Sequence, residues 1–443
     1  ELYKRGMPAG AYTEQWVLGH PEALLELQRG YVAAGSQVLI APTFGANRVR
    51  LEQHGIFGQV ADYNRRLVEL SRQAAGGRAL VAGDMAPTGL FIAPFGESSF
   101  EELVAIYTEQ AAALAAAGVD LFLIETTMTM PEARAAVLAC KSVSDRPAWV
   151  TLTCDENGRT LSGTVVLAAL IVMQGMGVDA FGLNCSSGPA EMLEQMRRLT
   201  PYTTVPLIAK PNAGLPETVE GQAVYHCPPE EFASYAAGFA AAGVRIFGGC
   251  CGTTPEHLRL TIEKCRKVPF RPPVAKRRTV VSSFSQAVEI GPKPVIIGER
   301  INPTGKSKFK AALRENNIEY ILGEGMAQED SGAHILDVNV GLPEIDEPAM
   351  MERVVTRLQS VIALPLQIDT SNTEAMERGM RLYNGKPMIN SVSGKMESME
   401  AVFPLVRKYG GVVVGLALDE NGIPSTAEGR IRIAKKIYDT AEK

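Results

Sequence analysis

One pattern of hydrophobic and polar positions recurs along the chain. An alanine-rich helical stretch ends in a small-residue turn and passes directly into a short apolar run, with clear copies beginning at Ala33, Ala116, Met176, Ala241 and Ser331. Apolar runs that alternate with helical segments are typical of parallel strands buried on both faces. The pattern predicts an α/β fold, and its regular spacing favours (β/α)8 barrels of TIM type.

The apolar runs predict two sets of strands. In the first part of the chain we expect strands at residues 37–44, 79–85, 121–127, 148–154, 180–185, 207–212 and 245–251. In the second part we expect them at 295–302, 335–340, 364–370, 387–393 and 411–418. Because a TIM barrel has eight strands, we expect the first barrel to lack its first strand and the second to be incomplete at its C-terminus. The chain would then be a fragment of a longer protein.

A stretch rich in proline and arginine, residues 268–278, separates the two sets of strands. Such a stretch is typical of a linker. The length of 443 residues suits two domains of barrel size. We therefore predict one domain at 1–270, a linker at 271–290 and a second domain at 291–443.

Composition narrows the class of protein. The net charge is −5 and no basic stripe is visible, which argues against nucleic acid as a partner. No uncharged apolar run reaches about 18 residues, and no signal peptide is visible, so we expect no membrane partner and a cytoplasmic location. Seven cysteines without the dense spacing of a secreted scaffold indicate a reducing compartment.

Three cysteines in glycine-rich turns are candidate metal ligands. Cys185 lies in Gly-Leu-Asn-Cys-Ser-Ser-Gly, and Cys250 and Cys251 lie in Gly-Gly-Cys-Cys-Gly. An extended strand would send adjacent cysteines to opposite faces, but the flanking glycines let the backbone leave strand geometry. Three protein ligands leave one position of a tetrahedral zinc open, which is the pattern of a catalytic site. A thiol bound there would be held as a nucleophilic thiolate, so we expect alkyl transfer to sulfur.

Other residues near the predicted strand ends have two interpretations. Glu125 either stabilises the fold or binds a substrate ammonium group, and Thr43 is a second candidate for substrate binding. His257 follows Thr254 and Pro255 in a pattern that indicates helix capping more than catalysis. The remaining cysteines are expected to be small core residues; they are Cys140, Cys154, Cys227 and Cys265.

The two cysteine motifs resemble those of the homocysteine S-methyltransferase family, a zinc-dependent barrel. The resemblance implies that Cys185, Cys250 and Cys251 hold zinc and serve as the catalytic centre. It further implies that Asn212, in Lys-Pro-Asn-Ala-Gly, lies beside the metal as a candidate fourth ligand, and that Glu125 lies near the amino group of homocysteine. The Asp-Gly-x-Met-Gly-Thr segment with which the family opens is absent from this sequence.

The second part of the chain resembles the pterin-binding barrel of dihydropteroate synthases and folate:corrinoid methyltransferases. The motifs are Ile-Gly-Glu-Arg-Ile-Asn-Pro-Thr-Gly from Ile297, Leu-Asp-Val-Asn from Leu336, Gln-Ile-Asp-Thr from Gln367 and Ile-Asn-Ser from Ile389. Carboxylates and carboxamides suit the donors and acceptors of a pterin edge, although any one of them could cap a helix instead. The predicted folate-binding residues are Glu299, Asn302, Asp337, Asn339, Asp369 and Asn390.

A homocysteine barrel followed by a pterin barrel is similar to the N-terminal half of the cobalamin-dependent methionine synthases. In that family methyl passes from 5-methyltetrahydrofolate to cobalamin, and then from methylcobalamin to zinc-bound homocysteine. The cobalamin-binding domain, in cis or in trans, has an Asp-x-His-x-x-Gly motif that this sequence does not contain. Two alternatives stay open: a bifunctional homocysteine methyltransferase and methylenetetrahydrofolate reductase, and a zinc- or thiol-binding module without catalysis.

Overall fold

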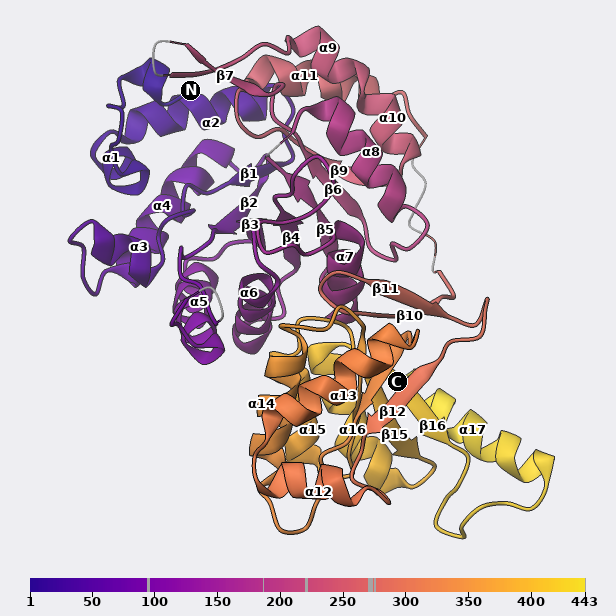
Figure 1. Ribbon diagram of the computed structural model, residues 1–443. Coiled ribbons are helices and arrows are strands. Elements are labelled where there is room, and N and C mark those ends of the chain that lie inside the picture. The colour runs from indigo at the N-terminus through magenta and orange to yellow at the C-terminus, as the bar shows by residue number, and fades with distance from the viewer. Residues whose placement is uncertain (94–95, 186, 220–221, 270–273, 275, 443) are drawn as a thin grey trace. The chain divides into compact units, whose positions relative to one another are not determined.

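The computed structural model describes residues 1–93, 96–185, 187–219, 222–269, 274 and 276–442. The chain divides into two compact units (Figure 1). The first comprises Glu1–Val166 and Val178–Lys276, and the second comprises Leu167–Gly177 and Arg277–Lys443.

The first unit is built on one parallel sheet with strand order β1-β2-β3-β4-β5-β6-β9. Its strands are β1 (Val38–Ile40), β2 (Leu80–Met85), β3 (Leu121–Thr127), β4 (Ala148–Leu152), β5 (Ala180–Asn184), β6 (Leu207–Lys210) and β9 (Val244–Phe247). Leu121 and Leu123 of β3 pack with Ala82, while the alternate residues Phe122 and Ile124 are also buried. Both faces of β3 are therefore covered, as the continuous apolar runs predicted.

Helices follow most of these strands and lie around the outside of the sheet (Figure 1). In α6, proline lies in the first turn, where it suits a helix start. The alanines of α6 are buried, and their small side chains let the helix pack closely. The helices are α1 (Thr13–Gly19), α2 (Pro21–Ala33), α3 (Arg48–Gln53), α4 (Val60–Ala75), α5 (Phe100–Ala116), α6 (Met130–Val143), α8 (Pro189–Leu199), α9 (Pro229–Ser234), α10 (Ala236–Ala241) and α11 (Pro255–Cys265), with a 3-10 turn at Tyr3–Arg5. From Leu167 onward, α7 (Val166–Gly175) belongs to the second unit.

The second unit is built on a parallel sheet with strand order β12-β13-β14-β15-β16. The strands are β12 (Ile297–Ile301), β13 (Ile335–Val338), β14 (Leu366–Asp369), β15 (Met388–Ser393) and β16 (Val412–Leu416). The helices are α12 (Ser307–Arg314), α13 (Ile318–Asp330), α14 (Glu347–Leu358), α15 (Thr373–Leu382), α16 (Met396–Tyr409) and α17 (Ala427–Ala441).

Two antiparallel strand pairs were not predicted. One, β7 (Pro216–Val219) with β8 (Gln222–Tyr225), follows β6. The other, β10 (Thr279–Ser282) with β11 (Ala287–Ile290), lies within the range predicted as a linker, of which residues 271–273 and 275 fall outside the described residues. Val281 of β10 is buried against Ile335 and Met388. The end of the predicted linker therefore contributes to the core of the second unit.

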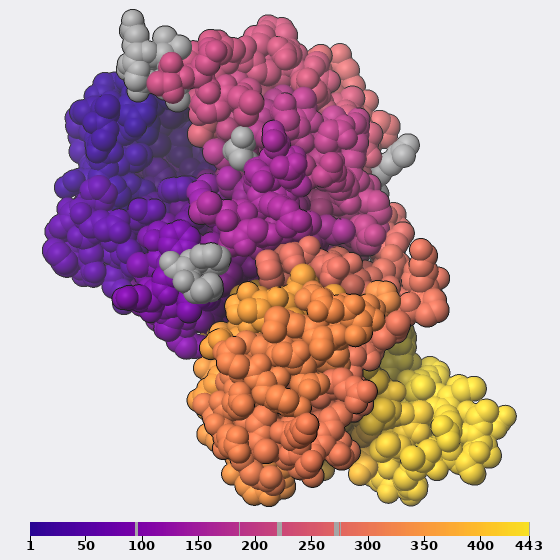
Figure 2. Space-filling view, in the orientation of Figure 1, coloured from indigo at the N-terminus to yellow at the C-terminus, as the bar shows by residue number. Residues whose placement is uncertain are grey.

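The last elements of the second unit are only partly covered. The residues of β16 are half-buried or exposed, and Leu416 is 40% exposed. On α17, Ile431 and Tyr438 are more than 60% exposed. The yellow C-terminal segment accordingly stands apart from the orange body of this unit in Figure 2. The β16 edge of the sheet is thus only lightly covered.

The α/β class with parallel sheets is confirmed, and every predicted strand has a counterpart. Among the residues the structure describes, β1 and β9 are not paired, nor are β12 and β16, so closure into two barrels, and their incompleteness, stay predictions. The boundary between the units after Lys276 falls inside the predicted linker. No helix in the described parts of the chain has the length and apolar character needed to cross a bilayer.

Candidate functional site

The three predicted cysteines meet at one point of the first unit. Their sulfur atoms lie within 4.8 Å of one another, and the Sγ atoms of Cys185 and Cys251 are 3.9 Å apart. Two thiolates bound to one tetrahedral zinc at about 2.3 Å would be about 3.8 Å apart. The Cys185–Cys251 separation is therefore close to that of two thiolates on one zinc, and the described residues contain no other comparable group of His, Cys, Asp or Glu.

The cluster forms because the backbone leaves strand geometry just before each ligand. Strand β5 ends at Asn184, and Cys185 adopts a left-handed conformation with φ 60°. Strand β9 ends at Phe247, and Gly252 has φ 80° after the cysteine pair. The amide of Cys251 donates to Oδ1 of Asn212 over 3.1 Å. Asn212 is thus beside the cluster, as the resemblance implied.

The protonation of the sulfurs reflects their crowding. Hydrogen bonding to Cys185 and Cys251, together with burial, raises the pKa of the Cys250 thiol. Hydrogen bonding to Cys185 likewise leads the causes that raise the pKa of Cys251. Three close sulfurs cannot all ionise without a compensating cation. A divalent metal is the group that would supply that compensation.

Glu125, predicted to bind a substrate ammonium group, already has a cation beside it. Its carboxylate pairs with Nζ of Lys210, and both side chains are buried. Burial alone would lower the pKa of Lys210, but the charges of Glu125 and Asp84 raise it. Burial, followed by the charge of Glu125, raises the pKa of Asp84. An incoming ammonium group would meet a carboxylate that is shared with the chain's own lysine.

The other sequence candidates of the first unit have structural partners. The hydroxyl of Thr43 donates to the carbonyl of Asp84 over 2.9 Å and accepts from the Asp84 amide. His257 accepts from the Thr254 amide at Nδ1 (3.2 Å), and its Nε2 lies 3.0 Å from the carbonyl of Cys227. The capping interpretation of His257 is therefore confirmed.

Of the cysteines assigned to the core, only two are fully enclosed. Cys140 and Cys154 are buried, and burial raises the pKa of Cys154 to about 12. Cys227 and Cys265 are half-buried, so the core assignment was wrong for them. Cys227 follows the unpredicted β7–β8 pair, and Cys265 ends α11 at the surface.

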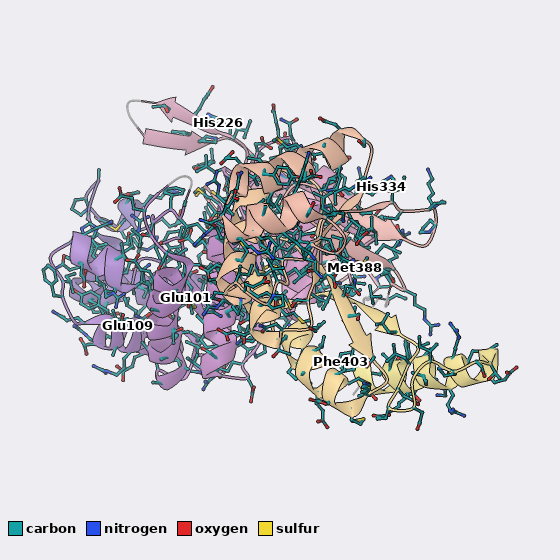
Figure 3. The ribbon with its side chains drawn as sticks, turned by 60° about the horizontal axis from the view of Figure 1, so that its bottom comes forward. Glu101, Glu109, His226, His334, Met388 and Phe403 are labelled. Carbon is teal, nitrogen blue, oxygen red and sulfur yellow. The ribbon has the colours of Figure 1, made fainter. Side chains whose placement is uncertain are left out.

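The β7–β8 pair brings a tyrosine that was not predicted, Tyr225, to the sulfur cluster. Tyr225 of β8 covers Gly252, where any Cβ would collide with the tyrosine ring. Burial, followed by the charge of Cys251, raises the pKa of Tyr225 to about 12. The next residue along the chain, His226 (Figure 3), has its Nε2 atom 2.7 Å from Oε2 of Glu217. Nothing in the local sequence pattern signals that Tyr225 would reach the cysteines.

In the second unit, most of the predicted folate-binding residues gather at the ends of neighbouring strands. Asn339 donates through Nδ2 to Oδ2 of Asp369 over 2.9 Å. Asp337 accepts from Nε2 of Gln367, its register partner on β14. Gln367 was quoted in the motif but not assigned to the site. Asp369 and Asn390 are register partners on β14 and β15, which places them side by side.

Burial and neighbouring charges shift the pKa values of the carboxyl groups in this cluster. Burial, reinforced by the charges of Asp369 and Glu299 and opposed by the hydrogen bond from Gln367, raises the pKa of Asp337 to about 7. Burial also raises the pKa of Asp369. Asn302 is different, because its Oδ1 accepts from the amide of Thr304 and so orders its own loop. The cluster therefore combines carboxyl and carboxamide groups, with Asn302 at its margin.

Comparisons with known proteins agree with this division. The profile of the pterin binding enzymes matches residues 298–438. The methionine synthases of Mycobacterium tuberculosis and Mycobacterium leprae are each 31% identical to the chain over 95% of its length. The chain spans 37% of the length of each of these relatives. It thus resembles the N-terminal half of a methionine synthase, as the motifs predicted.

A solved structure resembles the first part of the chain. The metallated form of the homocysteine methyltransferase MmuM from Escherichia coli is 26% identical, covers 60% of this chain and 93% of its own, and has a TM-score of 0.52. Its oxidized form gives 25% identity and a TM-score of 0.51, with 59% and 92% covered. The homocysteine S-methyltransferase profile matches residues 2–265, which is more than half of the chain. The protein therefore belongs to the homocysteine S-methyltransferase family.

Proposed function

We propose that this chain provides two substrate sites for methyl transfer in methionine biosynthesis. The first unit binds homocysteine as a zinc-held thiolate, and the second binds 5-methyltetrahydrofolate as the methyl donor. The observation that carries the proposal is the cluster of three sulfurs within 4.8 Å in a chain whose second unit matches pterin binding enzymes. The activity is that of a 5-methyltetrahydrofolate-homocysteine S-methyltransferase.

The donor set supports zinc as the metal. Thiolates are ligands that zinc prefers, and three of them leave the fourth position for a substrate sulfur. Zinc held by Cys185, Cys250 and Cys251 would keep the substrate thiol ionised, whereas a free thiol with a pKa near 8.5 is mostly protonated at neutral pH. Asn212, whose Oδ1 accepts from the amide of Cys251, is our candidate for the fourth position when no thiol is present. The solved relative described as a metallated form supports a bound metal in the first unit.

The chain's own residues orient the substrate. Glu125 attracts the ammonium group, and its carboxylate pairs with Lys210 inside a buried site. Thr43 fixes the backbone of Asp84, whose side chain lies beside Glu125. Together these residues would hold an amino acid by its charged end while its sulfur reaches the cysteines.

The second unit would bind the pterin ring by its edge of donors and acceptors. Asp369 and Asn390 stand side by side on neighbouring strands, and Asn339 holds Asp369 through its amide. Asp337 and Glu299 add carboxyl groups to the same cluster. Cobalamin, held by a domain in cis or in trans, would supply the methyl-carrying chemistry between the two substrates.

X-ray absorption at the zinc edge tests the thiol-activation part of this proposal. The zinc-loaded chain should gain a fourth sulfur ligand when homocysteine is added, and the edge should change accordingly. Methionine is the matched control, because it has the same amino-acid end but no ionisable thiol, and it should leave the edge unchanged. If the zinc absorption edge of a fully zinc-loaded chain did not change when homocysteine was added, the result would contradict the proposal.

A further inference from the structure

Asn184 lies between the two parts of the proposed homocysteine site, and its side chain is fully buried. Its Oδ1 accepts from the amide of Thr126 (2.9 Å) and from the hydroxyl of Thr151 (2.8 Å). Its Nδ2 donates to Oγ1 of Thr126 (2.8 Å) and to Sγ of Cys250 (3.8 Å). Both ends of the carboxamide are therefore fully engaged.

On one side, Asn184 holds an unusual stretch of backbone. Thr126 has φ 60°, which β-branched residues rarely adopt. The register between β3 and β4 shifts between Ile124 and Thr127, so Glu125 and Thr126 form an irregularity in the strand. Such irregularities re-aim side chains beside active sites. The two hydrogen bonds between Asn184 and Thr126, one in each direction, keep Thr126 in this conformation and thereby fix the direction of Glu125.

On the other side, Asn184 contacts a metal ligand. Its amide N–H points to the sulfur of Cys250, and its chain neighbour is Cys185. Hydrogen bonds to ligand atoms orient the ligands and tune the metal. One rigid carboxamide therefore joins the carboxylate that would bind the substrate ammonium to the sulfurs that would bind the substrate thiol.

We propose that Asn184 is a positioning residue that sets the spacing between Glu125 and the sulfur cluster, and so selects homocysteine over the shorter amino-acid thiol cysteine. This inference rests on the proposed function of the first unit. A thiol whose ammonium-to-sulfur distance matches the fixed spacing satisfies both ends at once. Cysteine is one methylene shorter and can make only the ammonium contact or the sulfur contact. It should therefore bind roughly 10- to 200-fold more weakly than homocysteine.

Cobalt-substituted protein tests the inference without measuring turnover. Cobalt(II) bound to thiolates gives charge-transfer bands that report both the ligands and an added thiol. Titrating the full chain with homocysteine and with cysteine yields two dissociation constants and their ratio. In Asn184→Ala the ratio should fall below about tenfold, because the spacing is no longer fixed. Before any thiol is added, the charge-transfer bands of this variant should lie at longer wavelength than those of the wild type, because the sulfur of Cys250 has lost the hydrogen bond from Asn184.

Matched variants separate positioning from general damage. Asn157→Asp changes an exposed asparagine of the same unit and should keep both the ratio and the bands. Thr126→Ala removes one of the bonds to Asn184 and should lower the ratio, whereas Thr126→Ser keeps the hydroxyl and should restore it. The Thr126 pair also carries the test if Asn184→Ala does not fold.

Different results would overturn the role of Asn184 and the proposed function of the first unit. If neither thiol changes the spectrum of the cobalt-loaded wild-type chain, the proposed function of the first unit is wrong. If homocysteine binds but the ratio in Asn184→Ala and Thr126→Ala equals that of the wild type, the role of Asn184 is overturned and the proposed function stands.

Discussion

The sulfur cluster of the first unit and the carboxyl cluster of the second are built in different ways. The cysteines stand on irregular backbone after β5 and β9 have ended, with Cys185 and Gly252 both at positive φ. In the second unit, Asp337 pairs with Gln367, and Asp369 with Asn390, in the regular register of parallel strands. One site depends on turns that leave the sheet, and the other depends on the sheet itself.

This difference teaches what holds each site in place. Removing one sulfur should destroy the first site, because each cysteine is one of only three metal ligands. Removing one carboxyl should weaken the second site by degrees, because several side chains share the binding of one ring edge. The following variants test that contrast.

The largest effect is expected from Cys250→Ala. Even a residue beyond the ligands typically changes metal affinity about 10–100-fold, so losing a ligand should weaken zinc binding by at least about 100-fold. Zinc analysis after dialysis against a chelator measures this loss, and binding of methyltetrahydrofolate to the same protein should stay unchanged. Cys265→Ala, a half-buried cysteine of the same unit, is the control and should keep its zinc. Equal loss of zinc and folate binding would argue against two independent sites.

Asp369→Ala should have an intermediate effect. A hydrogen bond to a charged group is worth about 1.5–3 kcal/mol, so methyltetrahydrofolate should bind roughly 10–100-fold more weakly by calorimetry. The zinc content should not change. Asp439→Ala, at an exposed aspartate of α17, is the matched control. Loss of zinc from Asp369→Ala would contradict the separation of the two sites.

The raised pKa of Asp337, about 7 and caused chiefly by burial, predicts a dependence of stability on pH. The folded chain holds this proton more tightly than the unfolded chain, where aspartate titrates near 3.9. The stability contributed by this group is therefore fully present below about pH 4 and is lost as pH rises to about 7. Asp337→Asn cannot titrate, so by urea unfolding it should gain roughly 1–2 kcal/mol on the wild type between about pH 5 and 8. Identical pH profiles for the two proteins would show that Asp337 titrates normally.

The sequence could predict what is encoded locally. The strands were readable because each is an apolar run between turns, and the metal ligands were readable because adjacent cysteines between glycines are rare. The β7–β8 and β10–β11 pairs were missed because their residues are mixed in polarity and, in β10, follow a proline- and arginine-rich stretch. Neither pair contains the continuous apolar run from which the other strands were predicted.

Contacts between distant residues were harder to predict. Lys210 and Glu125 are 85 residues apart, and a lysine at a strand end can equally extend to solvent. Gln367 lies two positions before Asp369, so strand alternation places both on one face of β14. That signal could have added Gln367 to the predicted site. Lys210 likewise lies two positions before Asn212 in the predicted strand, so the same alternation could have pointed to it, whereas no comparable signal pointed to Tyr225.

The smallest effect is expected from His257→Ala, which tests whether the sulfur site needs a histidine. The ring contributes hydrogen bonds to Thr254 and Cys227, so their loss should lower the free energy of unfolding by about 1–2 kcal/mol. His226→Ala, an exposed histidine beside β8, should cost much less. Both variants should retain zinc and show the wild-type change in the zinc edge on adding homocysteine. A His257→Ala protein that keeps its zinc but no longer responds to homocysteine would give this residue a role in substrate binding, because a helix cap alone does not alter the fourth position of the metal.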